Sequence, residues 1–338
     1  MEGKATRFER IVGGTDEEVE LAHQEVDANL NLSREEFAAR RVELSESERK
    51  FVATVGSSVN EVMQRYGGNP PPMAEENIYV VPPGGASELS NGRFDHGFCS
   101  PVGQYSVVDK SPSNVAWARS LAHELCHQQA YGALQIIEGD IVPYRMGITS
   151  CDRTGTEQYL HDLEEAIVAK LTDIVVEQEL RHHPDLEKEL NDRETVRTWL
   201  KKLFDLHEVP LEKQVVPLSV FNVADMADLA DFLNSDVPAE NPEMYKLGGL
   251  RGRLEKYQKQ NQLEGNERQR ERERLEEIIS DILNKLPDRF TDREAVFELF
   301  ARAHCNGDLL PLAKVIEETY GKGSFRKIAE ETKRVIIQ

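Results

Sequence analysis

Helical periodicity dominates the first part of the chain, residues 15–66. Ser33 and Glu36 have the spacing of a capping box, in which two side chains satisfy backbone N–H groups at the start of a helix. Over residues 45–65, apolar positions recur every three or four residues, which is typical of a helix with one buried face. These positions are Phe51, Val55, Val59 and Val62. The glycine- and proline-rich segment 67–72 then ends the helix, because proline lacks an N–H group and fixes φ.

Strand patterns begin after residue 72. Residues 78–81 are β-branched or aromatic and precede Pro-Pro-Gly-Gly, which predicts a strand and then a loop. A loop rich in glycine, serine and asparagine leads to a second predicted strand at 104–108, and a third strand region is expected over 134–149. A helix is expected between them, from residue 113 or 114 to about 131. A long helix should follow a loop at 152–156 and end near residue 181.

The remainder of the chain is predicted to be mainly helical. Residues 251–277 carry interleaved charges of both signs, which indicates a solvent-exposed helix face with ion pairs one turn apart. We therefore expect an α+β fold in three segments: a helical N-terminal region (1–72), a core that mixes strands and helices (73–184) and a mainly helical C-terminal region (185–338).

Composition narrows the possible partners and compartments. The chain has 338 residues and a net charge of −20, which argues against binding to nucleic acid or to anionic lipid. It begins without the apolar run of a signal peptide, and no stretch reaches the length of a membrane span. Its four cysteines, which lie far apart, are typical of thiols in a reducing cytoplasm, although a contact between Cys99 and Cys151 stays open. The sequence carries no signature of an oligomeric state.

The segment 121–128, Leu-Ala-His-Glu-Leu-Cys-His-Gln, contains an HExxH motif. On a helix, His123 and His127 lie one turn apart on the same side, so both imidazoles can reach one Zn²⁺ ion. Glu124 is rotated by about 100° from His123, which places it beside the metal, where it can take a proton from a zinc-activated water. Leu121 and Leu125 fall on the opposite side of the helix and can pack on a core.

Chance is a weak explanation for this motif. Nine histidines and at most 61 glutamates in 338 positions give about 0.04 matches per chain as an upper bound. The alternative interpretation is a pair of surface histidines that bind no metal.

A catalytic zinc needs a third protein ligand. The metzincin motif places a histidine six residues after His127, but that position holds Ala133, which excludes this subfamily. Glu165, on the later predicted helix, is the favoured ligand because small residues follow it on its own face. Glu164 is then a supporting or surface residue. His161, one turn before Glu165, is either a supporting residue of the metal site or a surface histidine.

These motifs resemble the gluzincins, and among them the small prokaryotic members called minigluzincins. The matching segments are His-Glu-Leu-Cys-His at 123–127, Tyr-Arg-Met-Gly-Ile at 144–148 and Leu-Glu-Glu-Ala-Ile-Val-Ala-Lys-Leu-Thr at 163–172. Glu164 stands where that family usually has an asparagine, and Ala169 stands where it often has a polar residue. The resemblance covers roughly residues 76–180.

The resemblance implies a zincin-like core, with a small mixed sheet above the active-site helix and a second helix that carries the glutamate ligand. It implies a cytoplasmic, zinc-dependent metallopeptidase that binds one Zn²⁺ and acts on a peptide or protein substrate, with Glu124 as general base. The predicted strand 104–108 would be the edge strand that pairs with extended substrate.

Members of this family usually add a donor for the developing oxyanion. The candidates here are Tyr105, Tyr159, His304 and Tyr320, each more easily explained as structural. Arg145 is expected to support the cleft through a buried ion pair. The alternative function is a latent or non-catalytic zincin-fold protein that binds or regulates a partner, because the resemblance leaves two large helical regions unaccounted for.

Overall fold

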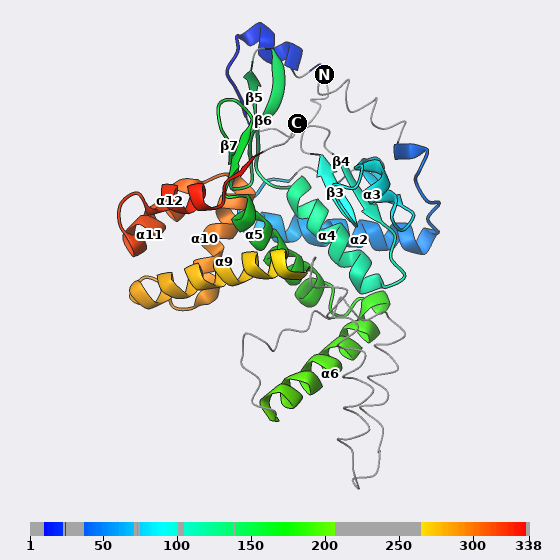
Figure 1. Ribbon diagram of the computed structural model, residues 1–338. Helices are drawn as coiled ribbons and strands as arrows, with labels where there is room; N and C mark the ends of the chain where they lie inside the picture. Colours follow the sequence, from blue (N-terminus) through cyan, green and yellow to red (C-terminus); the bar gives the residue numbers. More distant parts are fainter. Residues whose placement is uncertain are drawn as a thin grey trace, which may run out of the picture. The chain divides into compact units, whose positions relative to one another are not determined.

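The computed structural model describes residues 10–22, 24, 37–70, 73, 75–100, 105–137, 139–206 and 265–335 (Figure 1). The chain divides into two compact units. The first comprises residues 1–110, 118–179 and 271–338, and the second comprises 111–117 and 180–270. Helices and two small sheets confirm the α+β class. None of the described helices combines the length and apolar composition that a membrane crossing requires.

The smaller sheet has three strands and belongs to the first unit. Its order is β2 (Ile78–Val81), β4 (Tyr105–Asp109) and β3 (Gly97–Ser100), with β2 parallel and β3 antiparallel to β4. The expectation that residues 104–108 form the edge strand is therefore wrong, because β4 is central and β3 lies outside it. The sequence hides β3 because Gly97 and Ser100 are poor strand formers.

The two faces of this sheet pack against different parts of the protein. One face carries a buried apolar cluster in which Phe37 packs against Tyr79 and Tyr105, with ring centroids 5.5 and 4.8 Å apart. The opposite face lies on helix α4 (Asn114–Gln128), where the Ser106 hydroxyl donates to the Gln128 side-chain oxygen at 2.7 Å. This bond fixes the sheet above the helix that bears the HExxH motif.

The larger sheet is an antiparallel meander extended at both edges. Its strands are, in spatial order, β1 (Arg10–Val12), β5 (Gly132–Ile137), β6 (Asp140–Met146), β7 (Thr149–Cys151), β8 (Glu157–Tyr159) and β9 (Arg334–Val335). The single strand region expected at 134–149 is thus a hairpin plus the start of a third strand. Strands β1, β8 and β9 are too short for sequence periodicity to show.

The long helix α2 (Glu46–Arg65) confirms the expected helix at 45–65. Ser45 caps it, and Glu48 completes the capping box by accepting from the Ser45 backbone at 2.8 Å. Glu48 also pairs with Lys110 at 2.5 Å. Hydrogen bonds from Lys110 and Ser45 lower the pKa of Glu48 to about 2. The capping box expected at Ser33 and Glu36 lies outside the described residues.

Besides α2, α4 and the short α3 (Gly85–Leu89), the first unit contains α-helices that follow the meander along the chain. Helix α5 (His161–Ile174) continues into one π-helical turn, η2 (Val175–Glu179). Helices α10, α11 and α12 follow one another as a group beside α5 (Figure 1). The remaining bounds are α9 (Gly265–Lys285), α10 (Arg293–Asn306), α11 (Leu309–Tyr320) and α12 (Ser324–Glu331).

The second unit is built on helix α6 (Pro184–Leu206). The Glu189 carboxylate of α6 accepts hydrogen bonds from the Ser113 hydroxyl and from the Val115 N–H, which lies in the first turn of α4. Arg193 donates to the same carboxylate at 2.8 Å. The buried Glu189 carboxylate therefore accepts a hydrogen bond from a backbone N–H group that has no partner within the first turn of α4, the helix that carries the HExxH motif.

The expected division of the chain into residues 1–72, 73–184 and 185–338 stays a prediction, since residues 207–264 lie outside the described part. None of the four cysteines, all of which are described, forms a disulfide.

Candidate metal centre

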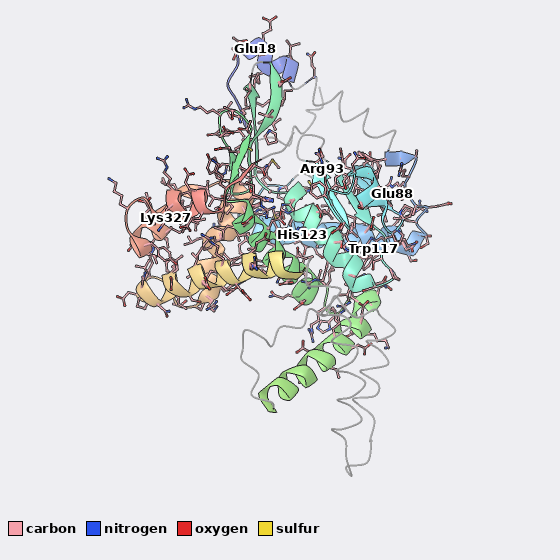
Figure 2. All side chains as sticks on the ribbon, in the orientation of Figure 1. Glu18, Glu88, Arg93, Trp117, His123 and Lys327 are labelled. Carbon is pink, nitrogen blue, oxygen red and sulfur yellow. The ribbon has the colours of Figure 1, made fainter. Side chains whose placement is uncertain are left out.

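Helix α4 presents the HExxH motif as the sequence predicts. Leu121 and Leu125 are fully buried, so one side of the helix is fixed in the core. His123 is 6% exposed, and His127 is partly buried on the opposite side. The amphipathic pattern thus orients both imidazoles away from the leucine side, and His123 lies where α4 meets α5 (Figure 2).

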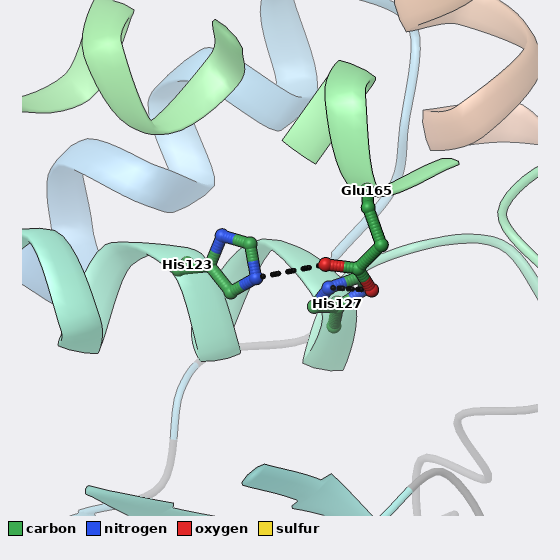
Figure 3. Close-up of side chains that lie close together, drawn as sticks. All are labelled: His123, His127 and Glu165. Carbon is green, nitrogen blue, oxygen red and sulfur yellow. Dashed lines mark ion pairs between the residues drawn. The ribbon is translucent and has the colours of Figure 1, made fainter. Parts of the chain in front are cut away.

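Glu165 of α5 points at both histidines (Figure 3). Its carboxylate oxygens lie 3.3 Å from Nε2 of His123 and 3.2 Å from Nε2 of His127. The two imidazole rings have centroids 4.9 Å apart and are inclined by 79°. One ligand atom from each residue lies within 4.8 Å of the others, which is the arrangement that a shared metal ion requires.

The electrostatics of this cluster are those of a tight ion-pair group. Burial would raise the pKa of Glu165, but the charges and hydrogen bonds of His127 and His123 outweigh it and hold the pKa well below the usual range. Burial also opposes protonation of His127, yet Glu165, with Glu124 and Glu164, raises the pKa of its imidazole to about 9. The carboxylates therefore concentrate negative charge where a cation would bind.

The donor set fits a catalytic zinc ion. Two imidazole nitrogens and one carboxylate are a recurrent three-ligand set for zinc, and they leave a coordination position open. Both histidines present the same ring nitrogen, Nε2, to the common point. The structure thus brings together all three ligands predicted from the sequence: His123, His127 and Glu165.

Glu124 lies beside this group and beneath strand β3. Its side chain is buried, with 7% of the residue exposed. A Cβ atom placed on Gly97 would lie 3.1 Å from the Glu124 Cγ and 3.3 Å from its Oε1. The missing side chain of Gly97 therefore makes room for the Glu124 carboxylate. Sequence reasoning placed Gly97 in a loop and did not find this role.

Glu164 is a buried residue and not a surface one. Its carboxylate accepts a hydrogen bond from the Ile148 N–H at 2.9 Å and pairs with Nδ1 of His304 at 2.7 Å. The same oxygen lies 4.0 Å from Nδ1 of His127. Gly147 turns around the carboxylate with φ +56°, leaving no room for a side chain. Burial would raise the pKa of Glu164, but the charge and hydrogen bond of His304 lower it, so the carboxylate stays ionised.

The expected oxyanion donors are engaged elsewhere. The Tyr159 hydroxyl donates to Glu157 at 2.6 Å, and the Tyr320 hydroxyl donates to Asp281 at 2.9 Å. Tyr105 packs in the aromatic cluster of the small sheet. His304 is fully buried and pairs with Glu164. The structural interpretation therefore holds for these side chains in the conformation observed.

Arg145 supports the site, but its partners differ from those expected. It donates to the backbone carbonyls of Gly147 at 2.8 Å, Gly307 at 2.6 Å and Ala303 at 3.2 Å. Its guanidinium also lies 4.9 Å from the ring centre of Tyr131. Among the described residues, backbone carbonyls at the end of α10 and in the turn after β6 thus take the place of the expected ion pair, and sequence spacing cannot reveal them.

His161 is the first residue of α5 and is partly buried. Burial lowers the pKa of its imidazole, although the Glu165 charge opposes this. Within the described residues no hydrogen bond joins it to Glu165. Both interpretations of His161 given above therefore remain.

The role of His304 had no signal in the sequence beyond its residue type, since its partner lies 140 positions away. No model of a known protein family, no curated protein and no solved structure matches this chain.

Proposed function

We propose that this protein is a zinc-dependent metallopeptidase of gluzincin-like type. The observation that carries the proposal is the convergence of Nε2 of His123, Nε2 of His127 and the Glu165 carboxylate, with Glu124 next to the first histidine on α4. Two histidines alone could be a surface pair. A third ligand from a separate helix, within 3.3 Å of both, is what distinguishes a metal centre.

The zincin-like architecture is supported by the order of layers around α4. The small sheet packs on α4 through Ser106 and Gln128, and α5 delivers the glutamate ligand. The outer strand of the small sheet, β3, lies over Glu124, and its residue Gly97 lies next to the Glu124 side chain. In this proposal β3, in place of residues 104–108, is the strand along which an extended peptide or protein substrate aligns.

The chemistry follows from these positions. Held by His123, His127 and Glu165, a zinc ion supplies Lewis-acid polarisation of the scissile carbonyl and a more acidic water. The Glu124 carboxylate accepts a proton from the attacking water and then passes it to the nitrogen of the leaving amine. The buried setting of Glu124 excludes bulk water from this proton transfer, and the absence of a side chain at Gly97 leaves room for the carboxylate.

The first experiment measures zinc content and peptide cleavage on the same preparations. We expect about one zinc per wild-type chain, and a loss of zinc in Glu165→Ala. Glu124→Gln should keep the zinc and lose cleavage, because the amide cannot accept the proton. Glu61→Gln, at an exposed position on α2, is the matched control and should change neither quantity. Zinc below about a third of an equivalent, unchanged in Glu165→Ala, would refute the proposal.

A second candidate is a latent or regulatory zincin-fold protein in the cytoplasm. The observation in its favour is the burial of His123 and Glu124, at 6% and 7% exposed. This candidate function predicts that the protein binds one zinc ion per chain and yet cleaves no member of a diverse peptide library. Cleavage by the wild type that disappears in Glu124→Gln would exclude this candidate.

A further inference from the structure

We propose that His304 is a positioning residue for the metal centre, acting through Glu164 on the imidazole of His127. The proposal rests on the metal site proposed above and adds a residue from the C-terminal helices to it. The site then includes a residue of α10 in addition to α4 and α5, the helices that supply the proposed ligands.

The contact between His304 and Glu164 is short and enclosed. Nδ1 of His304 lies 2.7 Å from Oε1 of Glu164. The histidine is 0% exposed and the glutamate 2% exposed. A buried polar group is stable only when it is hydrogen-bonded, so the Nδ1 contact helps to hold the Glu164 carboxylate in this enclosed position.

The position of this charge matters because of what lies on its other side. Nε2 of His127 faces Glu165, so its second ring nitrogen, Nδ1, faces away from the ligand cluster. Oε1 of Glu164, the oxygen that His304 holds, is 4.0 Å from that Nδ1. Metal-bound histidines are commonly oriented by a carboxylate at the ring nitrogen that does not bind the metal. Glu164 is therefore placed to orient the His127 ring.

The carboxylate has little freedom to move. Its other oxygen accepts the Ile148 N–H at 2.9 Å, and the Gly147 backbone closes against it. The backbone of His304 is also fixed, because its carbonyl accepts from the Tyr131 N–H at 3.0 Å. The His304 ring, the Ile148 N–H and the Gly147 backbone together hold the Glu164 carboxylate in one position.

The second nitrogen of His304 argues against a purely structural role. Nε2 is buried and has no hydrogen-bond partner among the described residues. An unsatisfied buried polar atom lowers stability, and an apolar side chain of similar size would avoid that penalty. The described hydrogen bond of this imidazole is the one that Nδ1 makes with Glu164.

The test compares zinc affinity across three variants, measured by competition with a chromophoric chelator. His304→Phe removes the Nδ1 donor, and we expect zinc affinity to fall about 10- to 100-fold, as for other residues that support metal ligands. His304→Asn places an amide nitrogen near the position of Nδ1, so its affinity should stay within about 3-fold of wild type. Phe300→Leu, a fully buried change on the same helix, is the control for general loss of packing.

Cobalt substitution gives a second readout, which a structural defect alone would not move. The visible bands of the Co²⁺-loaded His304→Phe protein should shift relative to wild type, whereas those of Phe300→Leu should not. The proposal is overturned if His304→Phe binds zinc as tightly as wild type, or if Phe300→Leu weakens zinc equally.

A failure to fold would not leave the matter open. If His304→Phe does not fold, His304→Leu replaces it and is compared with Glu164→Gln and with the double variant; a loss of affinity in the double variant equal to the sum of the two single losses refutes the coupling. If the wild type itself binds no zinc, the metal site fails together with this proposal. If the wild type binds zinc and His304→Phe binds it as tightly, the positioning role alone fails.

Discussion

Replacement of Gly147 by alanine should be one of the most destabilising single-methyl changes in the first unit. Gly147 has φ +56°, and the left-handed conformation costs a residue with a Cβ about 1–2 kcal/mol. The added Cβ would also fall on the carboxylate of Glu164, displacing the acceptor of the buried Ile148 N–H. Loss of such a charge-assisted bond is worth about 1.5–3 kcal/mol. The two effects together predict a loss of about 2.5–5 kcal/mol in the free energy of unfolding.

Gly139 provides a control for this experiment. It also has a positive φ, +93°, but a Cβ there would meet nothing within 4 Å. Gly139→Ala should therefore show the backbone penalty alone, about 1–2 kcal/mol. Urea unfolding of both variants, followed by circular dichroism, gives the difference that belongs to the crowding of Glu164. If Gly147→Ala costs no more than Gly139→Ala, the carboxylate is not rigidly held and the reasoning is wrong.

Three further changes test other parts of the structure. Gly97→Ala should displace Glu124 by a few tenths of an ångström and lower kcat about 10-fold, with zinc content unchanged; Ser100→Ala on the same strand should have no such effect. Glu48→Ala should lower the stability of α2 by about 1 kcal/mol at pH 7. Because the folded pKa of this carboxyl is about 2, below its usual 4.5, its contribution is present above pH 4.5 and lost as the pH falls towards 2, so the stability gap measured by urea unfolding should shrink over that range. Arg145→Lys keeps the charge but not the three-carbonyl fork, so thermal unfolding should show a loss of about 2 kcal/mol, and an unchanged midpoint would contradict the assignment.

The features that sequence predicted best are those with local causes. Helix α2 and the orientation of the HExxH motif follow from periodicity, because the apolar side of each helix must face a core. Glu165 could be chosen over Glu164 because small residues follow it on the same face, and the structure places it between the two histidines. The four-residue spacing of the histidines places both side chains on the same side of a helix.

The features that sequence missed depend on long-range placement. Strand β3 has the composition of a loop, and what makes it a strand is pairing with β4. Glu164 looked equally suited to a surface, and its burial depends on a histidine 140 residues away. Arg145 was expected to form an ion pair, but backbone carbonyls, which every residue carries, give no signal in side-chain chemistry. Such partners are fixed by tertiary packing, which no local pattern encodes.

The lengths of chain between the paired strands of the larger sheet determine which strand pairs form most easily and which open first. Strands β5 to β8 are joined by short connections, so their pairing closes small loops at little entropic cost. Strand β9 reaches β8 only after more than a hundred intervening residues, and it contributes two residues. Hydrogen exchange should therefore be slowest at β5 and β6 and fastest at β9. Arg334 of β9 pairs with Asp162, in the first turn of the helix that carries Glu165. The edge strand β9 is thus tied to the first turn of the helix that carries Glu165, and opening of β9 would break this ion pair beside the candidate metal site.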